Sequence, residues 1–475
     1  MHVSSRFKVN IVLSLLVLLS GCITLLIATK SGALAANLAI TLSPNAGPPI
    51  TAVKVKGAGF KGGETVSINF DTTLLATIMT STTGTFSLTI SVPQSAQPGN
   101  HTVYATGQTS GRSAQATFLV QTNWTVYGFN LHGTRFNPYE NVLTPANVSN
   151  LVLDWNYSTN GSIISSPAIA DGVVYVGSDD HNLYAFNAIT GVLLWSYTTG
   201  NNVRSSPAIA NGVVYVGSLD HNFYALNATT GTLLWSYTTG NFIESPPLIA
   251  NGVVYFGSDD HNLYALNATT GMLLWSYTTG SDIGFSSPAI ANGVVYIGSE
   301  DNKLYALNAK TGALLWSYTA SDEMYSSPAV ASGIVYIASK DDKLYALNAT
   351  TGALLWSYTT NGPNTSSPAI ANGVIYIGSQ DNKVYALNAK TGTFLWSYTT
   401  GSYIGLSSSG IADGVIYIGS SDSKLYALNA KTGVLLWSYM TGSIIYSSPV
   451  VANGVVYIGS DDNTFYAFHL PGSTP

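Results

Sequence analysis

Short alternations of apolar and polar residues run from residue 38 to residue 470, and turn residues separate them at regular intervals. Residues 65–68 (Thr-Val-Ser-Ile), 86–90 (Phe-Ser-Leu-Thr-Ile) and 213–216 (Val-Val-Tyr-Val) are typical, and Gly, Pro, Asn or Asp follows each run within a few residues. Such runs bounded by turns predict β-strands. Between residues 150 and 470 no run has the 3.6-residue spacing of an amphipathic helix, so the pattern predicts an all-β protein.

A repeat of 40 or 41 residues occupies residues 151–471. In one unit, residues 206–237, the apolar runs divide into four short strands, and Asn211-Gly212 between the first two is a strong signal for a two-residue hairpin turn. Four strands in about 40 residues predict one blade of a β-propeller. A tryptophan marks each repeat, at positions Trp155, Trp195, Trp235, Trp275, Trp316, Trp356, Trp396 and Trp437.

The number of strands predicts how the propeller closes. A strand of the Gly-Val-Val-Tyr type occurs eight times, the last time around Tyr457, and only one more strand, residues 465–468, follows it. The last unit therefore lacks a tryptophan strand, whereas residues 151–158 form a tryptophan strand without a unit. We expect residues 151–158 to complete the last blade. This pairing of the chain ends predicts an eight-bladed propeller without an open blade.

Residues 38–121 precede the repeat and predict a smaller domain. Alternating runs separated by Gly or Pro turns favour a small β-sandwich. The phrases Gly57-Ala58-Gly59-Phe60 and Pro98-Gly99-Asn100 resemble bacterial Ig-like modules of the IPT/TIG kind. The sequence shows no titratable cluster here, so we interpret the domain as a spacer or stalk. Residues 122–150 are interpreted as a linker between the two domains.

The first 36 residues have the features of an export signal. Arg6 and Lys8 precede an apolar run at residues 9–28. Leu19-Ser20-Gly21-Cys22 resembles the lipobox of bacterial lipoproteins, in which Cys22 is acylated. Cleavage after the A-x-A sequence at residues 33–35 and an uncleaved anchor, which needs about 20 apolar residues, are the alternatives. All three place the remaining chain outside the cytoplasm, with membrane contact only through this segment.

Composition excludes several classes of protein. Seventeen Lys and Arg face 23 Asp and Glu, which gives a net charge of −6 and no basic stripe for nucleic acid. Only 8% of residues are charged, so few ion pairs are expected on the surface. The single cysteine, Cys22, lies in the export segment, which excludes a disulfide framework and a Cys-rich metal site.

The tryptophan strand belongs to a longer motif. Residues 185–195, Ala-Phe-Asn-Ala-Ile-Thr-Gly-Val-Leu-Leu-Trp, resemble the A-x-D-x-x-T-G-x-x-x-W motif of PQQ-like, quinoprotein-type propellers, with Asn in place of the usual Asp. Six later copies extend the resemblance over about two-thirds of the chain. It implies that the Thr-Gly turn and the tryptophan join neighbouring blades. The eight tryptophans therefore have an expected structural docking role, since a buried indole N–H needs an acceptor.

The same resemblance implies that pyrroloquinoline quinone with calcium is a candidate cofactor. Quinone-binding members carry long insertions and a carboxylate and amide set for calcium, whereas these blades differ by one residue in length and show no unique carboxylate base. His181, His221 and His261 share one turn of three successive blades, which repeat copying explains. Asp pairs such as Asp179-Asp180 suit turns better than calcium. We expect no catalytic, metal-binding or cofactor-binding residue.

The copies differ mainly at one place. The residue before the Ser-Ser or Ser-Pro pair, at the start of each innermost strand, changes from blade to blade. In propellers these connections surround one mouth of the central channel. Aromatic side chains with one arginine and few acids suit a protein or peptide partner, the alternative being free drift of the loops. The candidate mouth residues are Ile164, Arg204, Glu244, Phe285, Tyr325, Thr365, Leu406 and Tyr446.

Together these features predict an exported, envelope-attached, monomeric propeller that acts as a protein-binding scaffold rather than as an enzyme. The lipobox and the eight blades are similar to the assembly lipoproteins of the β-barrel insertion machinery. Two alternatives stay open. One is a quinone-dependent dehydrogenase, and the other is a surface protein for carbohydrate binding or adhesion, which the 30 tyrosines would suit.

Overall fold

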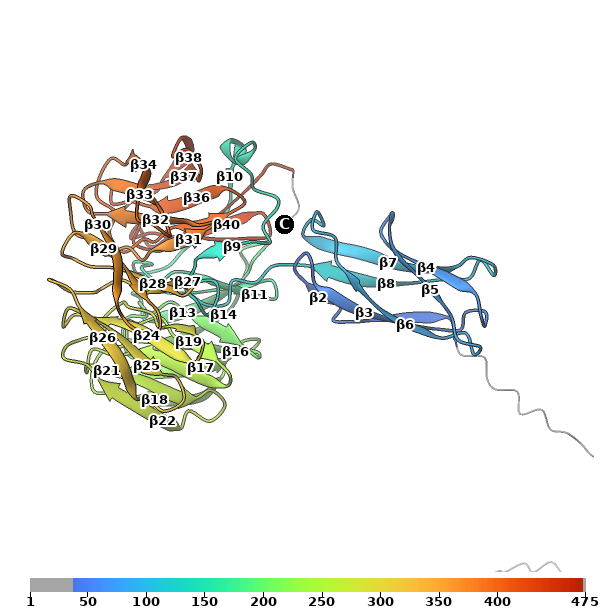
Figure 1. Ribbon diagram of the computed structural model, residues 1–475, viewed down its shortest axis with the longest axis horizontal. Helices are drawn as coiled ribbons and strands as arrows, with labels where there is room; N and C mark the ends of the chain where they lie inside the picture. The colour runs from blue at the N-terminus through green and yellow to red at the C-terminus, as the bar shows by residue number, and fades with distance from the viewer. Residues whose placement is uncertain (1–36, 473–475) are drawn as a thin grey trace, which may run out of the picture.

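The computed structural model describes residues 37–472, which form a narrow β-sandwich projecting from one side of a wider propeller (Figure 1). The expected export signal and Cys22 lie outside the described residues. The 3-10 helix η1 (Val148–Asn150) lies just before the propeller strands. Within residues 37–472 no helix is long and apolar enough to cross a membrane.

The sandwich consists of two sheets, with strand orders β1-β3-β6 and β2-β8-β7-β4-β5. Alternation along β3 places Val53 and Val55 in the core and Lys54 and Lys56 in solvent, as its period of two requires. Apolar side chains from both sheets form the core, which includes the fully buried Phe118. The strands are β1 (Ala39–Ser43), β2 (Ala46–Gly47), β3 (Ala52–Ala58), β4 (Thr65–Phe70), β5 (Thr73–Met79), β6 (Phe86–Ser91), β7 (Gly99–Gly107) and β8 (Ser113–Val120).

The propeller within residues 37–472 consists of eight sheets, which we call blades 1 to 8. Blades 1 to 7 take their four strands in sequence order, from β11–β14 to β35–β38, and blade 8 contains β39, β40, β41 and β10. The short strand β9 (Phe136–Asn137) adds to blade 7 as a parallel neighbour of β35. The all-β fold and the propeller predicted from the sequence are therefore confirmed.

The innermost strands line the channel and are β11 (Ala168–Ala170), β15 (Ala208–Ala210), β19 (Leu248–Ala250), β23 (Ala289–Ala291), β27 (Ala329–Ala331), β31 (Ala369–Ala371), β35 (Gly410–Ala412) and β39 (Val450–Ala452). The second strands are β12 (Val173–Gly177), β16 (Val213–Gly217), β20 (Val253–Gly257), β24 (Val294–Ser299), β28 (Ile334–Ala338), β32 (Val374–Ser379), β36 (Val415–Gly419) and β40 (Val455–Gly459).

The third strands are β13 (Asn182–Asn187), β17 (Asn222–Asn227), β21 (Asn262–Asn267), β25 (Lys303–Asn308), β29 (Lys343–Asn348), β33 (Lys383–Asn388), β37 (Lys424–Asn429) and β41 (Thr464–His469). The outer strands carry the repeated tryptophans and are β14 (Leu193–Thr198), β18 (Leu233–Thr238), β22 (Leu273–Thr278), β26 (Leu314–Thr319), β30 (Leu354–Thr359), β34 (Phe394–Thr399), β38 (Leu435–Met440) and β10 (Val152–Ser158).

A tight turn joins the first two strands of each blade. Asn211 and Gly212 have φ angles of 51° and 74°, the positive values that a type I′ turn requires. The hairpin predicted from Asn-Gly is therefore confirmed. The same pair of positive angles begins at Asp171, Asn251, Asn292, Ser332, Asn372, Asp413 and Asn453, each followed by glycine.

The two ends of the repeat pair with each other in blade 8. Strand β10 lies antiparallel to β41, with Val152 opposite His469 and Ser158 opposite Thr464. The prediction that residues 151–158 complete the last blade is confirmed. Blade 8 also contacts blade 1, where the N–H of Ser448 donates to Ser166 Oγ at 2.8 Å.

Tryptophans lie at the junctions between blades. Trp195 Nε1 donates to the Ala228 oxygen of the next blade at 3.0 Å, and its ring packs on Gly231, where an added Cβ would lie 2.7 Å from the indole. Each repeated tryptophan donates in the same way. The acceptors of Trp155, Trp195, Trp235, Trp275, Trp316, Trp356, Trp396 and Trp437 are Ala188, Ala228, Ala268, Ala309, Ala349, Ala389, Ala430 and Leu151.

A tyrosine on each second strand shares these acceptors. Tyr175 Oη donates to the Ala228 oxygen at 3.1 Å, and the equivalent bond recurs in six further blades. Tyr417 in blade 7 is the exception. Leu151 replaces the alanine at the junction with blade 8, and Tyr417 Oη is buried without a hydrogen-bond partner in residues 37–472.

Residues 122–150, interpreted from the sequence as a linker, instead pack along the inner edges of the blades. The innermost strands would otherwise present unpaired N–H groups to the channel, and backbone oxygens of this segment accept several of them. Trp124 pairs with Ile169 of blade 1 in both directions. The oxygens of Thr125, Leu131, His132, Thr134 and Arg135 accept the N–H groups of Ile209, Ile290, Val330, Ile370 and Ile411. We call residues 122–150 the closing segment.

The start of the closing segment lies at the end of the channel opposite the mouth. Thr122 N–H donates to Asn453 Oδ1, and Asn123 Oδ1 accepts the N–H of Asp171. Asn453 and Asp171 belong to the hairpin turns that follow the innermost strands, whereas the candidate mouth residues precede these strands. The sandwich, which contacts the closing segment through Asn141, therefore lies on the face opposite the mouth.

Candidate functional site

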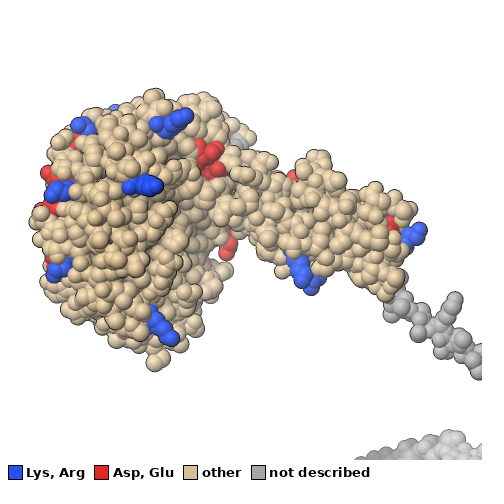
Figure 2. Space-filling view, in the orientation of Figure 1, with Lys and Arg blue, Asp and Glu red and all other residues tan. Residues whose placement is uncertain are grey.

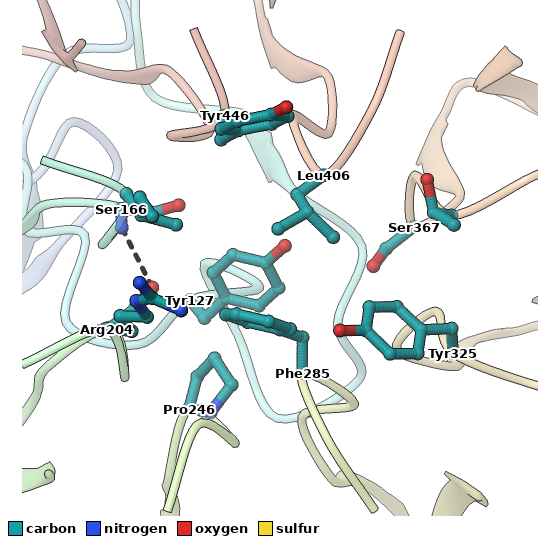
Figure 3. A pocket seen from close by; sticks show the side chains of 12 residues that line it. Tyr127, Ser166, Arg204, Pro246, Phe285, Tyr325, Ser367, Leu406 and Tyr446 are labelled. Atoms are coloured by element: carbon teal, nitrogen blue, oxygen red, sulfur yellow. Dashed lines mark hydrogen bonds between the residues drawn. The ribbon is translucent and has the colours of Figure 1, made fainter. Parts of the chain in front are cut away.

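Seven of the eight candidate mouth residues line one depression at the open end of the channel (Figure 3). Each directly precedes the serine pair at the start of an innermost strand, so the repeat places them around the channel axis. Glu244 is the eighth, and its Oε1 lies 3.6 Å from Arg204 Nη1. The seven are Ile164, Arg204, Phe285, Tyr325, Thr365, Leu406 and Tyr446.

Tyr127 of the closing segment forms the floor of the mouth. In Figure 3 its ring lies at the centre, with labelled side chains from several blades around it. Its hydroxyl lies 3.4 Å from both Ser408 Oγ and Ser448 Oγ. Tyr127 was not predicted from the sequence, because it lies in the segment interpreted as a linker. The signal was the aromatic content of that segment, since linkers are usually rich in Gly, Ser or Pro.

A circle of serine hydroxyls surrounds Tyr127. The Ser166 N–H of blade 1 donates to Ser206 Oγ of blade 2 at 2.9 Å. The equivalent bond joins each pair of neighbouring blades from blade 4 to blade 8, and also joins blade 8 to blade 1. Pro246 interrupts the circle in blade 3. A hydroxyl oxygen that accepts an N–H keeps its own proton as a donor. We call these residues the serine belt: Ser166, Ser206, Ser287, Ser327, Ser367, Ser408 and Ser448.

Carboxylates gather on blades 3 to 5 around the mouth. Burial raises the pKa of Glu244 to about 7, and the charge of Asp259 adds to the effect. Burial also raises the pKa of Glu300 to about 7, with repulsion from Glu323, and raises that of Asp259 to about 6, with repulsion from Asp282. Burial and mutual repulsion therefore make ionisation of these carboxyl groups less favourable than in water, and a cation brought by a partner would offset this penalty.

Two cations near the mouth already have partners. Arg204 donates to both oxygens of Asp179, from Nε at 3.1 Å and from Nη2 at 2.9 Å, so it belongs to Asp179 more than to Glu244. Lys340 forms an ion pair with Glu323 and lies 4.5 Å from the ring centroid of Tyr325. Charged side chains elsewhere are sparse and scattered, as the face in Figure 2 shows.

Aromatic side chains supply the apolar contacts of the mouth. The rings of Phe285 and Tyr325 from blades 4 and 5 lie 5.7 Å apart, tilted by 51°. The hydroxyls of Tyr403 and Tyr446 from blades 7 and 8 lie 3.2 Å apart. The mouth thus combines an acidic side with aromatic surface, a composition that suits recognition of a peptide carrying basic and apolar side chains.

The residues of the mouth do not fit pyrroloquinoline quinone with calcium. Tyr127 and the mouth side chains leave a cavity volume of about 20 Å³, which is room for about one water molecule. Among residues 37–472 no three His, Cys, Asp or Glu side chains are grouped to hold a metal ion. Asp180 illustrates the turn role of the aspartates, since it accepts the Asn182 N–H at 3.1 Å and the Tyr184 hydroxyl at 2.7 Å.

Comparison with known families agrees with the propeller. The model described as outer membrane protein assembly factor BamB matches residues 198–327, 281–409 and 404–472, together more than half of the chain. The chain belongs to this BamB family. The model of the glucose, ethanol and alcohol dehydrogenase β-propeller domain matches residues 124–205, so the resemblance to PQQ-like propellers is confirmed. The sandwich predicted over residues 38–121 coincides with a match of residues 36–120 to a macroglobulin-like domain.

Solved structures similar to this BamB-family chain share its fold at low identity. BamB from Moraxella catarrhalis is 21% identical with a TM-score of 0.60, over 67% of this chain and 99% of that one. Quinohemoprotein alcohol dehydrogenase from Comamonas testosteroni is 17% identical with a TM-score of 0.66, over 74% and 81%. The computationally designed protein Ika8 is 20% identical with a TM-score of 0.60, over 66% and 98%. No curated protein matches the chain.

Proposed function

We propose that this chain is a non-catalytic binding module of the cell envelope and that a protein or peptide partner binds at the mouth. One observation carries the proposal. In a repeat whose scaffold barely changes, seven of the eight varied positions line a single depression, and the eighth, Glu244, lies beside Arg204. A scaffold residue can be the same in each blade, whereas a site for one asymmetric partner needs different side chains around the circle.

The chemistry of the mouth supports a partner segment with a basic residue beside apolar or aromatic ones. The carboxylates of Glu244, Asp259 and Glu300 are crowded and partly desolvated, so a Lys or Arg side chain would gain more there than in water. The rings of Phe285 and Tyr325 lie beside this group and offer contact area to apolar neighbours.

Family membership supports a location in the envelope. The family model that covers most of the propeller is described as an outer membrane protein assembly factor. The export signal expected over residues 1–36, with Cys22 in its lipobox, agrees with this location. We infer that the chain acts outside the cytoplasm as a scaffold for other envelope proteins, while the sandwich serves as a spacer.

Affinity capture with matched variants tests the proposal. The double variant Arg204→Ala with Tyr325→Ala changes the mouth, and Lys310→Ala with Lys431→Ala changes exposed turns at the blade edges by the same number of side chains. We expect the wild type and the lysine variant to retain the same envelope partner and the mouth variant to lose it at least tenfold. Equal retention by all three would refute binding at the mouth.

The dehydrogenase alternative rests on the dehydrogenase propeller model that matches residues 124–205. Purified protein mixed with pyrroloquinoline quinone and calcium gives a direct test. Stoichiometric uptake of the quinone absorbance with dye reduction by alcohols would establish an enzyme and refute the scaffold. A carbohydrate-binding surface is tested on a glycan array, where binding that survives the Tyr325→Ala change would place it away from the mouth.

A further inference from the structure

A second cavity lies in the channel on the sandwich side of Tyr127. Tyr127 lines both this cavity and the mouth, so its ring separates them. The cavity volume is about 10 Å³, which is close to the space that one water-sized particle occupies. Its walls are Tyr127, Gly128, Asn130, Gly133 and Arg135 of the closing segment with Leu248, Ser287, Pro288, Ser327 and Pro328 of the blades.

Arg135 presents an unpaired charge to this cavity. The residue is 2% exposed, and Nη2 is buried without a hydrogen-bond partner in residues 37–472. Nη1 donates to the backbone oxygen of Tyr127 at 3.4 Å, and Cζ lies 3.6 Å from the centroid of the Tyr127 ring. Of the ion pairs formed by residues 37–472, none involves Arg135.

The charge of Arg135 has to be compensated, because a guanidinium does not lose its proton in proteins. Contact with the face of one aromatic ring offsets only part of the penalty of burying a cation. Glu140, a buried carboxylate of the closing segment, already accepts hydrogen bonds from the N–H groups of Val142, Leu143 and Gly454. No carboxylate within residues 37–472 pairs with Arg135, so a counter-charge from outside the chain would stabilise it.

Other groups around the cavity also favour negative charge. Ser327 Oγ accepts the Ser287 N–H at 2.9 Å, which leaves the Ser327 hydroxyl proton available as a donor. Although burial alone would raise it, the pKa of Tyr127 is lowered by Arg135 and by the serine belt members Ser408 and Ser448.

We propose that the cavity binds one small monovalent anion, of the size of chloride, between Arg135 Nη2 and the hydroxyl of Ser327. The anion neutralises the buried guanidinium and fixes the closing segment to the inner edges of the blades. A cavity volume of about 10 Å³ leaves room for one particle and excludes sulfate, phosphate and organic carboxylates.

Replacement of gluconate by chloride at constant ionic strength tests the site. A single site that exists only in the folded chain raises the folding equilibrium constant about tenfold for each tenfold rise in chloride above its dissociation constant. We expect this dependence in the wild type and in Arg112→Met, whose arginine bonds the Gly59 oxygen in the sandwich. Arg135→Met should remove it. Equal stability of the wild type in the two salts, or an unchanged dependence in Arg135→Met, would overturn the proposal.

Crystals of the full chain grown in sodium bromide provide a test that does not depend on folding of the variant. We expect a bromide anomalous peak within hydrogen-bond distance of Arg135 Nη2, and a cavity without that peak contradicts the proposal. The phenolate of Tyr127 is the competing counter-charge. A tyrosinate absorbance band at neutral pH in the wild type, lost in Tyr127→Phe, would assign the negative charge to Tyr127 and exclude the anion.

Discussion

Two substitutions with the same chemistry are expected to change stability in opposite directions. Tyr336 and Tyr417 occupy equivalent positions on the second strands of blades 5 and 7, and both are almost completely buried, at 1% and 0% exposure. Tyr336 Oη donates to the Ala389 oxygen at 2.9 Å, whereas Tyr417 Oη has no partner among residues 37–472. The difference arises because the chain ends meet at blade 8, where Leu151 replaces the alanine.

The magnitude follows from the hydrogen bonds. Tyr336→Phe removes one bond but leaves the Ala389 oxygen paired with Trp356 Nε1 at 3.2 Å, so we expect a loss of about 1 kcal/mol. Tyr417→Phe removes a buried hydroxyl that lacks a partner, whose desolvation costs about 1–3 kcal/mol, so we expect a gain of about 1 kcal/mol. Both changes delete the same oxygen atom, and the two variants should differ by about 2 kcal/mol.

Urea denaturation followed by tryptophan fluorescence measures the difference, because a change in midpoint at constant slope reports a change in stability. Tyr376→Phe, whose hydroxyl donates to Ala430, serves as a second paired control and should behave like Tyr336→Phe. If Tyr417→Phe destabilises the chain as much as the two controls, the Tyr417 hydroxyl has a partner at the closure. The junction between blades 7 and 8 would then not differ from the other junctions in its hydrogen bonding.

Three further changes test other parts of the structure by the same unfolding measurement. Burial raises the pKa of Glu244 to about 7, so the wild type should lose stability as pH rises from about 4.5 through 7. Glu244→Gln should therefore be about 2 kcal/mol more stable than the wild type at pH 8 and equally stable at pH 4. An unchanged difference across that range would contradict the ionisation argument. Gly231→Ala should cost about 3 kcal/mol, because φ is +69° and the new Cβ would lie 2.7 Å from an indole ring, whereas Gly63→Ala, with φ of +70° in open space, should cost about 1 kcal/mol. Similar losses would show that tryptophan packing is not tight. Ser332→Asn should add about 0.5 kcal/mol, because asparagine adopts the φ of 51° more readily, and a loss of stability would refute this reading of the turn.

Most of the fold could be predicted because the same pattern of strands and turns recurs in every repeat. Asn211-Gly212 predicted the hairpin, and the surplus tryptophan strand around Trp155 predicted the pairing of β10 with β41. The first signal is a pair of residue types, and the second is the order of the strands along the chain. The position of the candidate mouth followed from comparing the copies, since the residues before the serine pairs and their neighbours vary most.

The closing segment could not be predicted from the sequence in the same way. It holds the blades through its own backbone oxygens, such as those of Thr125 and Leu131, and a backbone acceptor leaves no mark on residue type. Arg135 was equally hidden, because an arginine in an irregular segment is usually solvated. The partner of Arg204 was also unexpected. Asp179 lies 25 positions earlier in the chain, and the two residues meet only because blades 1 and 2 are neighbours.

The route of the closing segment determines how the molecule would carry mechanical load. A pull applied through the sandwich reaches the inner edges of blades 1, 2, 4, 5, 6 and 7 through separate backbone bonds before it reaches β10. The tension is thus divided among six of the eight blades, and β10, which joins the two ends of the propeller, is protected from separating from β41. A tether on the sandwich could therefore be strained without opening the propeller.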